Sequence, residues 1–189
     1  MSTRGAYGYY IDGVSKICYN KYDSYPGGLG KEIADLLRHV EQGNVGGWEA
    51  LIPIARDIQM VEEDDSVKGL VNKSLKTFLL KHAGFRKNGL LRDVMVDGLS
   101  FLSDSLFCEH AYIINLDDGL FEYYRGFQDE PHALGRYAKD VQTPEHRLKT
   151  YYPVALMKTF SLDRMPKDIA AAIEESDVEY LARQGQEPA

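Results

Sequence analysis

Two short turns constrain this chain more than any other feature of its sequence. Asp12-Gly13 separates residues 5–11 from residues 14–19, and both flanking runs are rich in aromatic and β-branched side chains. A two-residue Asp-Gly loop favours a type I′ turn, because aspartate and glycine tolerate the positive φ that this turn requires. The sequence therefore predicts an N-terminal β-hairpin.

A second turn of the same kind lies in the middle of the chain. Asp117-Asp118-Gly119 separates residues 111–116 from residues 120–127. A three-residue loop with glycine last is typical of a hairpin closed by a bulge. Alternate residues of a strand share a face, so the second strand should place Phe121, Tyr123, Arg125 and Phe127 together, with Glu122 and Tyr124 opposite.

Helical periodicity occurs between the hairpins and again near the C-terminus. Apolar residues recur every three or four positions, which is typical of helices with one buried face. The predicted helices cover residues 29–41, 47–60, 67–83, 98–107 and 167–183, and a last strand covers residues 151–160. Asp97 is expected to cap the helix over 98–107. Residues 129–150 are polar and aperiodic, which predicts a long surface excursion.

The order of these elements indicates the fold class. Strands come in hairpins and do not alternate with helices, which favours an α+β fold over a parallel α/β fold. We expect an antiparallel sheet built from the N-terminal hairpin, the central hairpin and the late strand, packed against several helices. The 189 residues suit a single domain over 1–189, with residues 184–189 as a flexible tail.

Charge and cysteine content narrow the functional classes. The net charge of −7 argues against a broad nucleic-acid-binding surface, which needs many cations against phosphates. Cys18 and Cys108 are far apart and form no Cys-x-x-Cys motif, which predicts reduced thiols in a cytoplasmic setting, with one disulfide as the less favoured alternative. No apolar run approaches the roughly 20 residues that span a bilayer. Residues 1–4 lack an apolar signal core.

The segment Asn20–Lys31 (NKYDSYPGGLGK) is the strongest candidate for a binding site. Its glycines allow backbone N–H groups to turn towards a ligand. The helix predicted to begin near Leu29 adds the positive end of its dipole. Nearby cations, hydroxyl and amide groups, and tyrosines that can stack on a base suit a small anionic, nucleotide-like ligand. The predicted ligand-binding residues are Arg4, Tyr9, Asn20, Lys21, Asp23, Ser24, Tyr25, Gly28, Gly30 and Arg125.

Other interpretations of these residues stay open. The spacing matches neither a Walker A loop nor a Rossmann fingerprint, and no cofactor is expected. Asp23, Ser24 and Pro26 could simply shape a turn, with the glycines allowing the helix to pack tightly. Arg125 could clamp a phosphate or carboxylate, or it could pair with an acidic side chain or lie across an aromatic ring.

The chain also resembles a family of small uncharacterised proteins from bacteriophages and bacterial genomes. The resemblance lies in Thr3-Arg4-Gly5, Tyr19-Asn20, Asp23-Ser24-Tyr25-Pro26 with Gly28-Leu29-Gly30, the stretch from Phe107 to Phe127 that ends in Tyr123-x-Arg125-Gly126-Phe127, and Tyr152-Pro153-Val154. It implies a phage or prophage setting, in which small accessory proteins often act against host defences. It supplies no catalytic residues.

Three functions follow as hypotheses. The first is a cytoplasmic phage accessory protein that binds a nucleotide-like ligand and sequesters a host defence signal. The second is a hydrolase or transferase at the same pocket, for which Ser24 with His110, or Ser2 as an N-terminal nucleophile, offers a weak signal. The third is an inhibitor that contacts a host protein through residues 129–150. Homo-oligomers are compatible with all three.

The sequence predicts no metal site. The available ligand types are His82, Cys108, Glu109, His110, His132 and His146, and no pair shows a diagnostic spacing.

Overall fold

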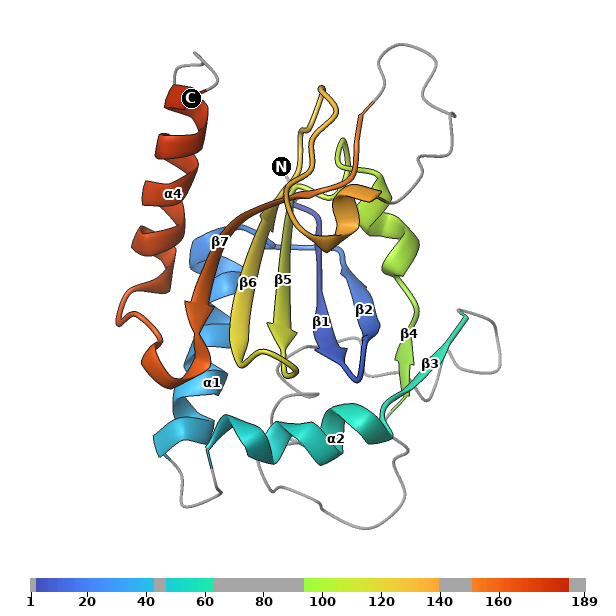
Figure 1. Ribbon diagram of the computed structural model, residues 1–189, viewed down its shortest axis with the longest axis vertical. Coiled ribbons are helices and arrows are strands. Elements are labelled where there is room, and N and C mark those ends of the chain that lie inside the picture. The colour runs from blue at the N-terminus through green and yellow to red at the C-terminus, as the bar shows by residue number, and fades with distance from the viewer. Residues whose placement is uncertain (1–2, 43–46, 63–93, 140–150, 184–189) are drawn as a thin grey trace.

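The computed structural model describes residues 3–42, 47–62, 94–139 and 151–183. Its centre is a five-stranded sheet with the strand order β2-β1-β5-β6-β7 (Figure 1). The strands are β1 (Gly5–Ile11), β2 (Val14–Asn20), β5 (His110–Asn115), β6 (Leu120–Arg125) and β7 (Ala155–Ser161). The predicted α+β class is confirmed, with both hairpins and the late strand in one sheet.

Both hairpin turns have the backbone that their sequences predict. Asp12 and Gly13 adopt φ values of 51° and 74°, and Gly119 adopts a φ of 66°. The two turns also contact each other, because the N–H groups of Asp12 and Gly13 donate to the Asp117 carboxylate over 2.7 and 2.9 Å. The Asp117 side chain therefore ties the ends of the two hairpins together.

The centre of the sheet differs from the purely antiparallel arrangement expected. The β1–β2, β5–β6 and β6–β7 pairs are antiparallel, but β1 and β5 are parallel, with Gly5 opposite His110 and Tyr10 opposite Asn115. A tight turn can join only antiparallel neighbours, and a long connection is needed to return a strand in the same direction. Residues 21–109 form that connection, which is why local turn signals could not reveal the pairing.

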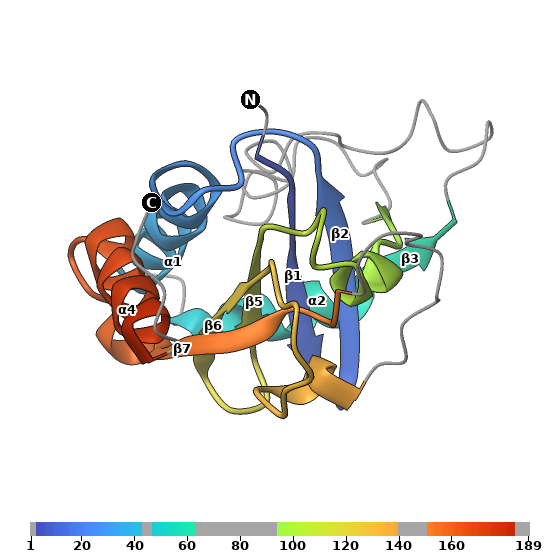
Figure 2. The same ribbon diagram turned by 90° about the horizontal axis from the view of Figure 1, so that it is seen from above.

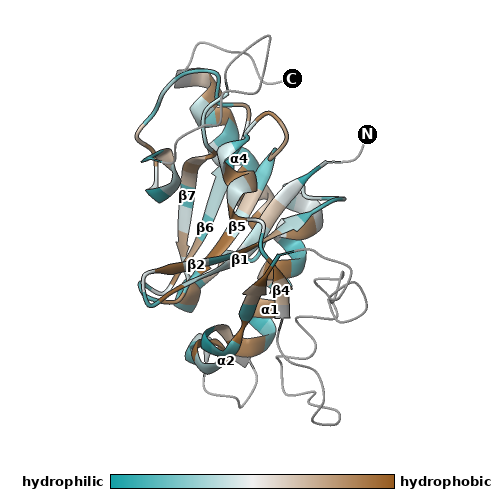
Figure 3. Cartoon of the chain, turned by 90° about the vertical axis from the view of Figure 1, so that its right-hand side faces the viewer, coloured by the Kyte–Doolittle hydropathy of each residue, from teal (hydrophilic) through white to brown (hydrophobic). Residues whose placement is uncertain are grey.

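Within the described residues, three helices contribute to the core on one face of the sheet. They are α1 (Lys31–Gln42), α2 (Leu51–Asp57) and α4 (Ile169–Arg183). Figure 2 shows α1 and α4 side by side near the β7 end, and Figure 3 shows hydrophobic and hydrophilic residues alternating around α1 and α2. The buried side chains that meet these helices include Tyr7, Tyr9, Tyr112, Phe121 and Tyr123. We call this the helical face.

The opposite face of the sheet is covered by short elements. Two 3₁₀ turns, η3 (Leu99–Ser103) and η4 (Arg136–Lys139), place Leu102 and Tyr137 against Ile113 and Tyr124. We call this the second face. The described part of the predicted excursion is therefore packed on the sheet through η4, and residues 140–150 lie outside the described residues.

Several predicted boundaries are wrong. The helix over 47–60 is a 3₁₀ turn (Trp48–Ala50) followed by α2, which ends at Asp57 because Ile58 turns extended with a ψ of 124°. Residues 59–61 instead form β3 (Gln59–Val61), which pairs in parallel with β4 (Val94–Val96), and neither strand was predicted. The helix over 98–107 shortens to η3, although Asp97 does accept the N–H of Leu99 over 2.9 Å. The helix predicted over 67–83 lies outside the described residues.

Both cysteines are free, as the sequence predicts, and both are buried. Burial raises the pKa of the Cys18 thiol to about 12, with Asp97 adding to the shift, so this thiol is not a ready nucleophile. No helix within the described ranges has the length and apolar character needed to cross a membrane.

Close packing of β1 against β2 gives a direct test of the sheet. A Cβ added to Gly8 would lie 2.0 Å from the Lys16 carbonyl oxygen, a clash that the neighbouring backbone cannot avoid. We expect Gly8→Ala to lower the free energy of unfolding by about 3 kcal/mol, the upper range for overpacking. Urea unfolding followed by circular dichroism measures this change.

Gly27→Ala is the matched control for Gly8→Ala. A Cβ at Gly27 would meet only the Tyr25 ring at 3.5 Å, an ordinary contact. Its effect should stay within about 0.5 kcal/mol, as for most surface substitutions. Equal effects of the two substitutions would contradict the register between β1 and β2.

Candidate functional site

The segment Asn20–Lys31 crosses the end of the sheet on its way from β2 to α1 (Figure 2). It contains one π-helical turn, η1 (Pro26–Gly30), which precedes α1. The Ser24 N–H donates to the Thr3 carbonyl over 3.1 Å, and the Leu29 N–H donates to the Asp23 carbonyl over 2.8 Å. Because these donors are already bonded within the chain, a ligand here would have to be held mainly by side chains.

Ser24 is the buried centre of this segment. Its hydroxyl Oγ accepts a hydrogen bond from Asn20 Nδ2 over 2.8 Å, and its backbone carbonyl accepts one from the Tyr112 hydroxyl over 2.9 Å. Ser24 is fully shielded from solvent and lies directly against Gly5 of β1. Ser24 therefore fastens the segment to the centre of the sheet.

The glycines of the segment allow close packing. A Cβ at Gly30 would lie 2.9 Å from the Tyr112 ring, and one at Gly28 would lie 2.3 Å from the Asp23 carbonyl oxygen. This contact set agrees with the alternative interpretation, in which the glycines let the helix approach the sheet. This packing leaves the exposed side chains of the same segment available to contact a ligand.

The remaining predicted site residues fall into different places. Tyr25 is 46% exposed, Asp23 is exposed, and Lys21 lies over the Tyr22 ring at 5.3 Å. Lys31 is paired with Asp35 on α1.

Two predicted site residues lie away from the segment. Tyr9 is buried in the core. Arg4 lies over the Phe107 ring at 4.3 Å. Arg4 is also out of phase with Gly5 along the strand, which separates it from the helical face.

Arg125 lies on the helical face, at the same end of the sheet as the segment. It forms an ion pair with Asp177 of α4. Asp177 also accepts a hydrogen bond from the Tyr123 hydroxyl over 2.9 Å, and the same hydroxyl lies 3.0 Å from Nδ1 of His110. We call these four residues, His110, Tyr123, Arg125 and Asp177, the His110 network.

The His110 network is continuous with the segment. The Tyr112 and Tyr123 ring centroids are 5.6 Å apart, and Tyr112 is the residue that holds Ser24. Helix α4 also packs against η1. Ser24 and Arg125 therefore lie along one path of contacting residues, whereas Arg4 lies apart from it.

Burial disfavours the charged forms within this network. It lowers the pKa of His110 to about 4, and the Arg125 guanidinium adds to that shift. Burial also raises the pKa of Asp177, although Arg125 and the Tyr123 hydroxyl oppose the shift. The pKa of Tyr123 rises far above its usual range, first because of burial and then because of the Asp177 charge. At neutral pH the imidazole is therefore neutral.

Sequence reasoning missed most of this network. It placed Tyr123 and Arg125 on one face of the second hairpin, and the same alternation places His110 and Tyr112 on one face of the first strand. Pairing the two strands would have brought His110 opposite Arg125. Asp177 carries no such signal, because an acidic residue in a helix is normally exposed.

A second polar network lies on the second face. The Glu122 carboxylate is 3% exposed, accepts hydrogen bonds from Asn115 and Tyr124 over 2.8 Å each, and pairs with Arg136 of η4. The Arg136 guanidinium also lies over the Tyr10 ring at 3.6 Å. Glu122 and Tyr124, which the sequence predicts on one face of the second strand, therefore contact each other, and Glu122 also pairs with Arg136, whereas Arg125 lies on the other face.

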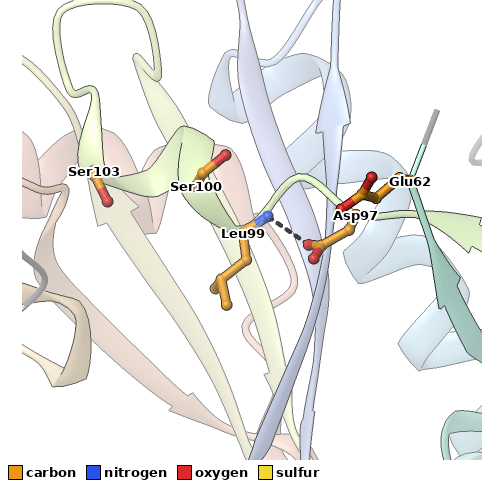
Figure 4. Close-up of a pocket in the computed structure, with 5 residues that line it drawn as sticks. All are labelled: Glu62, Asp97, Leu99, Ser100 and Ser103. Atoms are coloured by element: carbon orange, nitrogen blue, oxygen red, sulfur yellow. Dashed lines mark hydrogen bonds between the residues drawn. The ribbon is translucent and has the colours of Figure 1, made fainter. Parts of the chain in front are cut away.

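A surface hollow lies elsewhere, beside η3. It has a volume of about 470 Å³ and is lined by Glu62, Asp97, Leu99, Ser100 and Ser103 (Figure 4). Two carboxylates make this hollow unfavourable for an anion. It is therefore not the site that the sequence predicts.

The described residues contain no group of three or more side chains suited to bind a metal ion. His132 bonds instead to the Pro153 carbonyl over 2.8 Å, and His82 and His146 lie outside the described ranges, as does Ser2.

Comparison with protein-family models, with curated proteins and with solved structures found no match to this chain.

The pKa of His110 predicts how stability depends on pH. An unfolded histidine has a pKa of about 6.5, so between pH 6.5 and about 4 the unfolded chain binds a proton that the folded chain does not. The His110 contribution is complete above pH 6.5 and declines towards pH 4, by at most about 3 kcal/mol. Asp177, with a raised pKa, contributes the opposite slope at acidic pH.

Comparison of the native protein with His110→Gln isolates this effect. Glutamine keeps a donor for the Tyr123 hydroxyl but does not titrate. Urea unfolding between pH 4.5 and 7.5 should give a steeper loss of stability at acidic pH for the native protein than for His110→Gln. Parallel curves would contradict the depressed pKa of His110.

Proposed function

We propose that this protein binds a small anionic, nucleotide-like ligand where the segment Asn20–Lys31, strand β6 and helix α4 meet. The observation that carries the proposal is the position of Arg125, which lies on the helical face and is linked to Ser24 through Tyr123 and Tyr112. An arginine on a tyrosine-rich face suits a phosphate or a carboxylate, because its planar donors fit two oxygens at once.

A second cation supports the anionic character of the ligand. Lys158 of β7 is exposed and lies opposite Tyr123 in the β6–β7 register, so it shares the helical face with Arg125. Asp177 neutralises Arg125 in the ligand-free protein. An incoming anion therefore competes with Asp177, whose raised pKa reflects the cost of burying its charge.

Exposed aromatic residues support the nucleotide-like character. Tyr22 and Tyr25 of the segment are 58% and 46% exposed. Exposed tyrosines offer an apolar face on which a base can stack, with about 1–3 kcal/mol for each stacked base. They lie on the segment that Ser24 fastens beside the sheet.

Binding without turnover fits this site better than catalysis. Tyr112 and Tyr123 have strongly raised pKa values, and the Ser24 hydroxyl is buried against Asn20. None of these groups is an activated nucleophile. A protein that holds a nucleotide unchanged could sequester a signal, which suits the phage setting implied by the sequence resemblance. Hydrolysis or transfer at the same place is the alternative.

Two variants of the ion pair test the proposal. Asp177→Asn removes the competing charge but keeps an acceptor for Tyr123, so it should tighten binding of a nucleoside monophosphate about tenfold. Arg125→Met/Asp177→Asn leaves no charge at the pair and should abolish binding. A thermal-shift screen with nucleotides and cyclic nucleotides, followed by titration calorimetry, measures both effects.

Lys139→Met is the matched control. Lys139 is exposed on η4, which covers the second face, and its loss removes one positive charge without touching the proposed site. It should leave affinity unchanged. Binding that survives in the double variant, or no binding of any nucleotide by the native protein and Asp177→Asn, would overturn the proposal. Ligand recovered chemically altered would favour the enzyme alternative.

A further inference from the structure

The His110 network fixes which nitrogen of the imidazole carries its proton. The Tyr123 hydroxyl has one hydrogen, and it donates that hydrogen to the Asp177 carboxylate over 2.9 Å. The hydroxyl can then only accept from His110, so Nδ1 at 3.0 Å must be the donor. A neutral imidazole with its hydrogen on Nδ1 leaves Nε2 with a free lone pair.

The lone pair on Nε2 is not used by any residue in the part of the chain that the structure describes. His110 is only partly buried at the start of β5, and no described residue forms a hydrogen bond with Nε2. Its neighbour across the β5–β6 pair is Arg125. Directly opposed residues of an antiparallel pair have Cβ atoms about 5 Å apart, so one small ligand can reach both side chains.

We propose that Nε2 of His110 is a fixed hydrogen-bond acceptor that selects anionic ligands carrying a hydroxyl donor. This inference rests on the proposed function for the contact between Arg125 and the anionic group. The substrate class that it names is a hydroxylated phosphate, such as a nucleotide or sugar phosphate with free ribose hydroxyls. A deoxygenated analogue would leave Nε2 without its partner.

The charges around His110 maintain this selection at neutral pH. Arg125 and Tyr123 of β6 face the imidazole, Asp177 of α4 binds both of these residues, and Glu174 of α4 acts on Asp177. Burial and Arg125 depress the pKa of His110 to about 4, so the imidazolium, which would donate from both nitrogens, does not form near pH 7. An acceptor at Nε2 is therefore maintained over the physiological range.

The tautomer of His110 can be determined in the absence of a ligand. In the native protein labelled with ¹⁵N-histidine, long-range ¹H–¹⁵N correlation spectra at pH 7 should show His110 with its proton on Nδ1. The resonance that disappears in His110→Leu identifies the residue. Tyr123→Phe removes the acceptor that holds this proton and should shift His110 towards the Nε2–H tautomer. A native His110 with its proton on Nε2 overturns the inference.

Selection is measured with two nucleotides that differ only in their hydroxyls. The native protein should bind adenosine 5′-monophosphate roughly five- to tenfold more tightly than 2′,3′-dideoxyadenosine 5′-monophosphate, which is the net effect of one hydrogen bond. His110→Leu, which removes the imidazole, should bind the two nucleotides equally well. His39→Gln, an exposed histidine of α1, should keep the native preference.

The outcomes separate the two proposals. Binding of both nucleotides with equal affinity by the native protein overturns the selection by His110 and leaves the anion site in place. Absence of binding by the native protein and by Asp177→Asn overturns the proposed function itself, and with it the selection that rests on it. A preference for the hydroxylated nucleotide that disappears in His110→Leu supports both.

Discussion

The parallel pairing of β1 with β5 is the contact on which the rest of this structure depends. Each hairpin alone exposes the outer edges of both its strands, and a two-stranded hairpin is marginally stable in water. Joining the free edges of β1 and β5 makes one sheet whose central strands are buried on both faces. Gly5 lies opposite His110 in that pair, and the absence of a side chain at Gly5 leaves the space that Ser24 occupies.

Buried tyrosines determine what the two faces of the sheet contain. Tyr112, Tyr123 and Tyr124 are fully buried, and each hydroxyl donates to an oxygen of the chain. A buried hydroxyl without a partner would destabilise the fold by about 1–3 kcal/mol, so each tyrosine requires an acceptor nearby. Ser24, Asp177 and Glu122 supply those acceptors. The polar networks on both faces therefore exist because these positions carry tyrosine, whose hydroxyl needs a partner, and not phenylalanine.

The two buried carboxylates differ in what they leave for function. Glu122 is enclosed by Asn115, Tyr124 and Arg136, which fixes η4 on the second face. Asp177 of α4 is shared between Tyr123 and Arg125, and one of its oxygens has no hydrogen bond within the described part of the chain. The first arrangement is that of a structural anchor. The second can exchange one partner for a ligand, and for this reason we place the proposed site there.

The sequence by itself determined the local structure. Asp12-Gly13 and Asp117–Gly119 specified both hairpins, because positive φ is a property of the turn residues themselves. The apolar spacing in α1 and α4 specified those helices for a similar local reason. The helix ends predicted near Ile58 and around η3 were wrong, because those ends depend on packing partners that the local sequence does not show. Only the tertiary structure decided that β1 and β5 run parallel, that Arg125 meets Asp177 and that His110 joins them, because those contacts join residues far apart in the chain.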